Sequence, residues 1–438
     1  MGHFVVLYLF LSSVIFLSSQ DFASHVQAVF TCQKSDIEAL MTFKIEIQDP
    51  YNRLMSWEGN SCCEWPGIKC DNISRAVTAL DLSGYGLGGN ISSSLAKLGL
   101  TYLNLSKAGF YGTVPPQFEN LSNLEYLDLS SDDFESLLAV ESLDWLIGFQ
   151  SLKHLSLDGV DMSRVGLNWL EDLNKLSRLN ELHMSDCLLT GSISSLSMVN
   201  FTSLVFIDFS FNSFFSSFLN WILNISSIRH IDMTNADLYG RISLGVGELP
   251  NLEYLNLAVN NLSASSYQLF KGSWSSIKSI YLSTNKLIGK LPSGIGNMTS
   301  LVEFDLFLNN IEGGIPSSIG KLCNLRLFDL SSNNLTGCLP EHLSGQENCE
   351  SGSPLPNLRF LALSNNRLHG NLPAWLGQVR NLIELSLSHN SFQGPIPSSL
   401  GGKTKHSGTC KEQSKWNSAR DTWKFIIAVR ARSVFQSV

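Results

Sequence analysis

Five residues with side chains suited to acid–base or metal chemistry lie on neighbouring repeats and could meet. His154, His183 and Asp208 recur at similar intervals, and His230 could approach Asp208 or Asp232. A histidine beside a carboxylate can serve as a general base, and imidazoles with a carboxylate can bind a metal ion. However, the chain has no H-E-x-x-H, G-x-S-x-G or phosphate-loop motif. Repeats of equal pitch rarely supply such geometry. We therefore predict no enzymatic activity, no metal and no cofactor.

The intervals come from a repeated segment that must position these side chains. The pattern L-x-x-L-x-L-x-x-N-x-L begins at Val77, Leu100, Leu124, Leu152, Leu179, Leu204, Ile228, Leu252, Ile277, Leu301, Leu325, Leu358 and Leu382. Apolar positions 4 and 6 share one face of a short strand, which cannot bury that face alone. Stacked coils would bury it. The pattern predicts a leucine-rich repeat array over 77–400, an α/β solenoid curved around a parallel concave sheet.

Position 9 of the pattern is asparagine in many repeats, which predicts a ladder of buried amides that satisfy backbone groups. Its members are Asn212, Asn260, Asn285, Asn309, Asn333, Asn366 and Asn390. Cys187 takes the same place in its repeat, so we predict a small buried side chain rather than a reactive thiol. Many repeats continue as x-G-x-[I/L/V]-P, in which glycine permits a tight turn and proline ends the segment.

Two rows of side chains are expected on the concave face. Position 3 carries Tyr102, Tyr126, His154, Phe206, His230, Tyr254 and Phe360, and position 5 carries Asp81, Asp128, Asp208, Asp232, Asp305 and Asp329. The aromatic row could anchor a ligand, although aromatic residues also simply suit strands. The aspartate row could receive cationic or hydroxyl-rich ligands, or could be an ordinary solvated face.

We expect the ligand to bind the middle and C-terminal repeats, because a glycan at Asn104 would block the first ones. That region is lined by Asn256, Tyr281, Asp305, Phe307, Leu308, Asp329 and Phe360. Phe307 and Leu308 stand out, since most repeats have polar residues there and exposed apolar side chains suggest contact with a partner.

The N-terminus and the composition indicate a secreted protein. Phe4–Leu17 is an apolar run too short to span a bilayer, which predicts a signal peptide over 1–28. Nine N-glycosylation motifs agree: Asn72, Asn90, Asn104, Asn120, Asn200, Asn224, Asn261, Asn297 and Asn334. The net charge of −8 argues against nucleic-acid binding. We expect an extracellular protein, at the cell membrane if a full-length product carries a transmembrane helix.

The segment 29–76 resembles the N-terminal cap of plant cell-surface receptors with leucine-rich repeats. The matching motifs are Asp49-Pro50, Leu54-Met55-Ser56-Trp57 and the run from Cys62 to Asp71. The preceding segment predicts a helix, with Ser35 and Glu38 at capping-box spacing. The resemblance implies disulfides Cys32–Cys62 and Cys63–Cys70. A further bridge, Cys323–Cys349, would tether an enlarged loop, with Cys338 as a competing partner.

The longer repeats are similar to those of defence-type plant receptor-like proteins. The resemblance implies recognition of a peptide, protein or elicitor, with signalling through partner receptor kinases. The alternative is a soluble inhibitor or decoy similar to polygalacturonase-inhibiting proteins. Residues 401–438 form a basic tail without the repeat. We expect a truncated or frame-shifted product; the alternative is a genuine tail that covers the open end of the last repeat.

Overall fold

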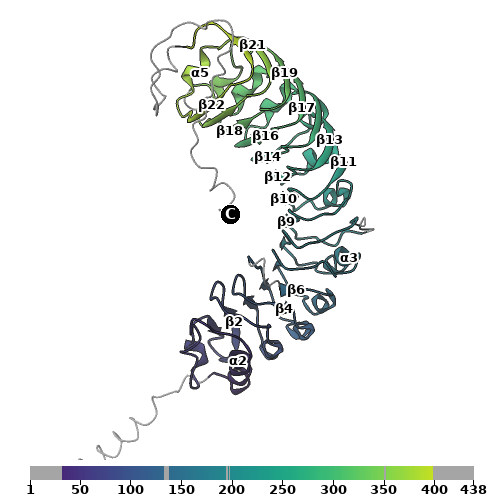
Figure 1. Ribbon diagram of the computed structural model, residues 1–438, viewed down its shortest axis with the longest axis vertical. Helices are drawn as coiled ribbons and strands as arrows, with labels where there is room; N and C mark the ends of the chain where they lie inside the picture. The colour runs from purple at the N-terminus through teal and green to yellow at the C-terminus, as the bar shows by residue number, and fades with distance from the viewer. Residues whose placement is uncertain (1–31, 133–137, 194–195, 197, 350–351, 398–438) are drawn as a thin grey trace, which may run out of the picture.

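The computed structural model describes residues 32–397 except 133–137, 194–195, 197 and 350–351. The predicted signal peptide and basic tail, including Cys410, lie outside these residues. The described chain forms a curved arc of stacked coils that runs from the N-terminal end at the bottom of Figure 1 to the C-terminal repeats at its top. Among the described residues, no helix has the length and apolar character needed to cross a bilayer.

The inner side of the arc is a sheet of 14 strands, in which each repeat contributes one and the segment before the first repeat adds another. The first strand pairs antiparallel with the second, and the others pair parallel to one another. The strands in spatial order are β1 (Ile68–Cys70), β2 (Val77–Asp81), β3 (Tyr102–Asn104), β5 (Tyr126–Asp128), β7 (His154–Ser156), β8 (Glu181–His183), β9 (Phe206–Asp208), β10 (His230–Asp232), β12 (Tyr254–Asn256), β14 (Ser279–Tyr281), β16 (Glu303–Asp305), β18 (Leu327–Asp329), β20 (Phe360–Ala362) and β22 (Glu384–Ser386). The predicted solenoid with a parallel concave sheet is confirmed.

Strict register between neighbouring strands builds the core. Position 4 of one repeat pairs with position 4 of the next, as Phe304 does with Phe328. Both rings are buried and stack with centroids 5.7 Å apart. Each coil therefore buries its apolar face against its two neighbours, and one continuous hydrophobic core runs along the arc.

A second sheet, which the repeat pattern did not predict, lies on the outer side of the C-terminal half (Figure 1). Its strands are β11 (Tyr239–Arg241), β13 (Asn261–Ser265), β15 (Lys286–Lys290), β17 (Asn310–Gly313), β19 (Asn334–Gly337), β21 (Arg367–Asn371) and β23 (Ser391–Gln393). A two-stranded pair, β4 (Gly112–Thr113) and β6 (Leu138–Ala139), lies nearer the N-terminus. Glycines of the x-G-x-[I/L/V]-P segment lie in this sheet with positive φ, for example Gly289 at +86°. Other residues rarely adopt this conformation.

Short helices complete the coils. The α-helices are α2 (Lys34–Glu46), α3 (Trp169–Leu173), α4 (Ser266–Leu269) and α5 (Trp375–Gln378). The 3₁₀ helices are η1 (Cys62–Glu64), η2 (Ser93–Lys97), η3 (Pro116–Asn120), η4 (Asp144–Gly148), η5 (Asn220–Asn224), η6 (Leu244–Glu248), η7 (Ser293–Asn297), η8 (Ser317–Lys321) and η9 (Gln346–Asn348).

Helix α2 lies at the N-terminal end of the array. The capping box predicted there is wrong: Ser35 lies inside the helix, where its hydroxyl donates to Asp36, and the N-cap Gln33 makes no capping bond. Asp36 is buried, and its carboxylate accepts from the Val77 backbone N–H at 2.8 Å. The helix is thereby joined to the first repeat by a hydrogen bond as well as by packing.

Three disulfides occur in the described residues, and each joins a pair that the sequence suggested. Cys32 pairs with Cys62, and Cys63 with Cys70. Cys323 pairs with Cys349, while the competing Cys338 remains a free, exposed thiol.

The asparagine ladder is present as the pattern indicated. Each position-9 amide donates to a backbone carbonyl of the preceding repeat, and its oxygen accepts from a backbone N–H there, as in Asn285 with Leu257 and Leu262. Cys187 is fully buried in the corresponding place, with Sγ 3.1 Å from the Leu157 carbonyl oxygen. Burial raises the pKa of this thiol well above its usual value, so Cys187 is an inert core residue.

Candidate functional site

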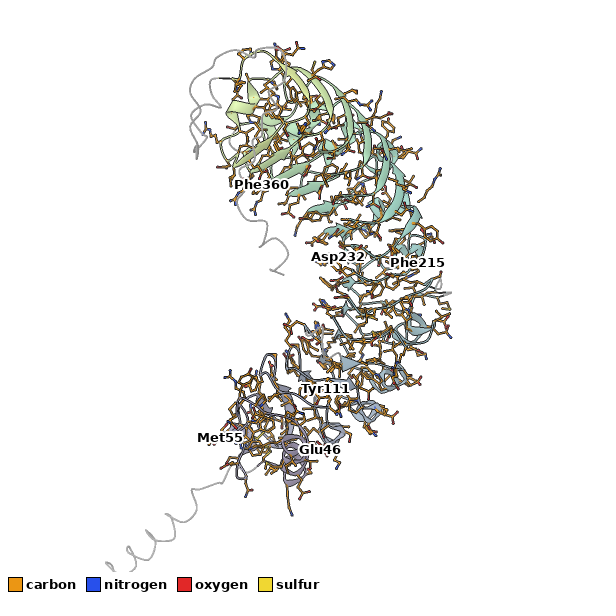
Figure 2. All side chains as sticks on the ribbon, in the orientation of Figure 1. Glu46, Met55, Tyr111, Phe215, Asp232 and Phe360 are labelled. Atoms are coloured by element: carbon orange, nitrogen blue, oxygen red, sulfur yellow. A yellow bond between two sulfur atoms is a disulfide. The ribbon has the colours of Figure 1, made fainter. Side chains whose placement is uncertain are left out.

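The concave face carries side chains at positions 3 and 5 of the repeats, because these alternate with the buried positions along each strand. Parallel pairing in register brings equivalent positions together, as with Phe206, His230 and Tyr254 on β9, β10 and β12. Figure 2 shows Asp232 and Phe360 on this inner side of the arc and Phe215 on the outer side.

The aromatic row forms a continuous stack of eight rings. In spatial order these are Tyr102, Tyr126, His154, His183, Phe206, His230, Tyr254 and Tyr281. Ring centroids are 4.0–4.3 Å apart in five of the seven contacts, and interplanar angles there are 4–24°. The rings cover one another's faces, so a ligand would meet mainly ring edges and polar atoms.

The stack is tilted at two contacts. His154 and His183 are 5.1 Å apart at 40°, and Tyr254 and Tyr281 are 5.7 Å apart at 49°. At both contacts the ring moves from position 3 to position 5. Glu181 holds position 3 at the first of them, and its Oε2 lies 2.8 Å from His154 Nδ1. Sequence reasoning missed Glu181, although its break in the aromatic row was visible.

Burial makes two of these histidines poor bases. It lowers the pKa of His183 to about 4, with a smaller contribution from the neighbouring His154. Burial likewise lowers the pKa of His230 to about 4. Both imidazoles are therefore neutral at physiological pH. His183 and Asp208 are cross-strand partners, but the described side chains include no hydrogen bond between them.

The aspartate row has a structural role. Each member accepts a hydrogen bond from the backbone N–H two residues later, at 2.8–3.1 Å; the members are Asp81, Asp128, Asp208, Asp232, Asp305 and Asp329. These bonds fix the turn that leaves each strand. Burial raises the pKa of Asp208 and of Asp305 to about 6, and neighbouring carboxylates add to this. The row is thus less available to a ligand than a solvated ladder would be.

Polar atoms between the two rows are also bonded to one another. Asn256 donates to Asp232 at 3.0 Å and to the Tyr254 hydroxyl at 3.2 Å. The Tyr281 hydroxyl donates to Glu303. Burial raises the pKa of Tyr254 and of Tyr281 above the usual range, so both remain protonated donors.

Apolar side chains are exposed in the C-terminal repeats. Phe307, Leu308 and Phe360 are 37%, 47% and 38% exposed. Leu327, which the sequence analysis did not single out, lies beside Phe360 on the neighbouring strand. These four residues are called the apolar strip below. The strip belongs to the repeats of β16, β18 and β20, whereas the stack ends at Tyr281 on the adjacent strand β14.

The backbone of Leu308 lies in the left-handed region, with φ of 53°. Position 8 of other repeats adopts the same conformation. The residue there is small or polar in several repeats, as in Asn235, Ser332 and Asn365, but it is apolar and exposed at Phe211 and Val259 as well. Asparagine tolerates this conformation, whereas a branched apolar residue is strained in it. Leu308 is therefore unfavourable to the fold in two respects, because it is both strained and exposed.

The glycosylation motifs differ in accessibility. Seven of the nine asparagines are exposed and Asn334 is half-buried. Asn104 is only 8% exposed, and its amide oxygen accepts from the backbone N–H and hydroxyl of Ser106. Its amide nitrogen, the atom that a glycan would modify, donates to the Tyr102 hydroxyl at 3.3 Å.

The fold and this surface define a leucine-rich repeat protein with an extended concave face. The Leucine rich repeat N-terminal domain family matches residues 33–71, and the Leucine Rich Repeat family matches residues 276–298, 300–322, 324–346, 357–379 and 381–402. Both families are of a generally non-catalytic kind.

More particularly, the chain is similar to plant receptor-like proteins. It is 32% identical over 279 residues to Receptor-like protein EIX1 of Solanum lycopersicum, which covers 53% of this chain and 26% of the relative. It is 29% identical over 316 residues to Receptor-like protein EIX2 of the same species, covering 63% and 28%. The chain thus spans little more than a quarter of the length of these relatives.

Solved plant ectodomains have the same fold. The structure of PEPR1 with AtPEP1 aligns at a TM-score of 0.65 and 28% identity, over 84% of this chain and 50% of that one. The Arabidopsis receptor kinase HAESA, in complex with the peptide hormone IDA and the co-receptor SERK1, aligns at 0.62 and 25%, over 84% and 68%.

Proposed function

We propose that this chain is an extracellular, non-catalytic recognition module that binds a peptide or protein ligand on its concave face. The observation that carries this proposal is the apolar strip. Leu308 keeps a strained backbone conformation while exposing its side chain, and Phe307 and Phe360 expose theirs on the same face. Exposed strained residues with no benefit to folding suggest contact with a partner.

The strip favours a ligand that presents apolar side chains. Neighbouring concave positions offer only their remaining acceptor sites, because the Tyr281 hydroxyl already donates to Glu303 and the carboxylates of Asp305 and Asp329 already accept backbone N–H bonds. The similar HAESA ectodomain binds a peptide hormone together with a co-receptor, which supports an analogous partnership with receptor kinases here. The three disulfides suit an oxidising, extracellular location.

A phage-displayed peptide library selected on the purified full chain tests this proposal. Selected peptides should lose at least tenfold in affinity for a variant carrying Phe307→Ser, Leu308→Asn and Phe360→Ser. They should bind a Phe215→Ser variant as they bind the wild type, because Phe215 is 61% exposed but lies on the outer side (Figure 2). Peptides that bind all three proteins equally would refute recognition at the strip.

A further inference from the structure

Three side chains with metal-binding atoms converge where the ring stack shifts from position 3 of the repeat, at His154, to position 5, at His183. Oε2 of Glu181 lies 2.8 Å from Nδ1 of His154 and 3.9 Å from Nε2 of His183. The donor atoms of the three residues all lie within 4.8 Å of one another. They come from only two adjacent strands, β7 and β8, whose register places His154 beside Glu181.

Small shifts would bring these atoms to metal-binding distances. Zinc–nitrogen and zinc–oxygen bonds of about 2.0–2.2 Å in a tetrahedral site place the donor atoms about 3.4 Å apart. Both imidazoles are already oriented by stacking, His154 on Tyr126 at 4.2 Å and His183 on Phe206 at 4.3 Å. The Glu181 side chain is 47% exposed and has room to adjust.

A second observation concerns the Nε2 atom of His183. This nitrogen is buried and has no hydrogen-bond partner among the described residues. Its distance of 3.9 Å from Glu181 is too long for a hydrogen bond. Buried polar atoms nearly always have a partner, so an unpartnered one needs an explanation. A hydrogen bond between His154 and Glu181 accounts for two of the three side chains but leaves this atom unsatisfied.

We propose that His154, Glu181 and His183 form a binding site for a divalent transition metal of the zinc class. Imidazole and carboxylate ligands suit Zn²⁺, Co²⁺, Ni²⁺ and Cu²⁺ better than they suit Ca²⁺ or Mg²⁺. Two histidines and one carboxylate leave at least one coordination position for water or another donor. The site is independent of the apolar strip and of the peptide ligand proposed above.

Titration calorimetry with Zn²⁺ on the full chain, purified without a histidine tag, tests the site. We expect one ion per chain with a Kd in the micromolar range or tighter. Three single variants should each bind at least tenfold more weakly, which corresponds to about 1.4 kcal/mol. They are His154→Phe and His183→Phe, which keep an aromatic ring in the stack, and Glu181→Gln, which keeps the shape of the side chain.

His230→Phe is the matched control, because it changes a histidine of the same stack outside the cluster. It should leave zinc binding unchanged. Co²⁺ absorption provides a second readout: strong visible bands indicate tetrahedral ligation and should vanish in the Glu181→Gln protein, whose folding is checked by circular dichroism. No saturable binding below about 1 mM Zn²⁺, or equal binding by the wild type and the three variants, would overturn the proposal.

Discussion

Replacing Asn309 by alanine should open the solenoid locally. The side chain is 7% exposed and makes four hydrogen bonds, two of them across the boundary with the preceding repeat and two within its own repeat. Its oxygen accepts from the Leu287 backbone N–H at 2.9 Å. Its nitrogen donates, at 2.9–3.3 Å, to the carbonyls of Leu282, Leu306 and Phe307. Alanine removes all four bonds and leaves a buried N–H without a partner.

The cost follows from these contacts. A hydrogen bond contributes about 1 kcal/mol net, and an unsatisfied buried donor costs about 1–3 kcal/mol. The three carbonyls share the two N–H groups of the amide, so these bonds are weaker than three separate ones. We therefore expect a loss of about 3 kcal/mol for Asn309→Ala. Repeats interact mainly with their neighbours, so the loss should appear locally as well as in global unfolding.

Native-state hydrogen exchange is the sharpest assay. A loss of about 3 kcal/mol should speed exchange of the Leu287 amide about 100-fold. Asn310→Ala is the control, since Asn310 is adjacent in sequence but exposed. It should change the same amide's exchange little. If the Leu287 amide exchanges at the wild-type rate in Asn309→Ala, or equally fast in the control, the ladder does not stabilise the array as argued.

Three further predictions concern pH, strain and glycosylation. Burial raises the pKa of Asp158 to about 7, so the contribution of this residue to stability should be lost as pH rises from about 4 to 7. Asp158→Asn keeps a side-chain oxygen that can accept from the Ser185 N–H. In urea denaturation this variant should be as stable as the wild type near pH 4 and more stable near pH 8, by at most about 4 kcal/mol. The control Asp186→Asn, which changes an exposed residue, should show no such trend. Leu308→Asn should raise the midpoint of unfolding, with a gain of about 1 kcal/mol, because asparagine tolerates the left-handed backbone; a lower midpoint would remove the argument from strain. Glycopeptide mass spectrometry should find Asn104 the least occupied of the nine motifs, and full occupancy there would contradict the burial argument.

Much of the fold could be predicted from the sequence because every repeat buries the same apolar positions against the equivalent positions of its neighbours. A position such as Phe304 meets its own equivalent, Phe328, in the next coil, so one pattern determines both its burial and its register. The asparagine ladder was predictable for the same reason. The outer sheet was not, because its strands depend on how closely successive turns approach, and the pattern L-x-x-L-x-L does not determine that distance.

The candidate site was less predictable, since exposure and bonding depend on neighbours from both adjacent coils. The pattern placed Tyr126 and Asp208 on the concave face, but only the structure shows that ring faces are covered and carboxylates bonded to the backbone. It also brings Glu181 between two histidines. The sequence by itself determined which residues face inward and which face the concave surface, through the strict periodicity of the repeat. Only the tertiary structure decided which of the surface residues remain free to bind a ligand. The ring faces and polar atoms of most of these residues already make stacking contacts or hydrogen bonds within the array.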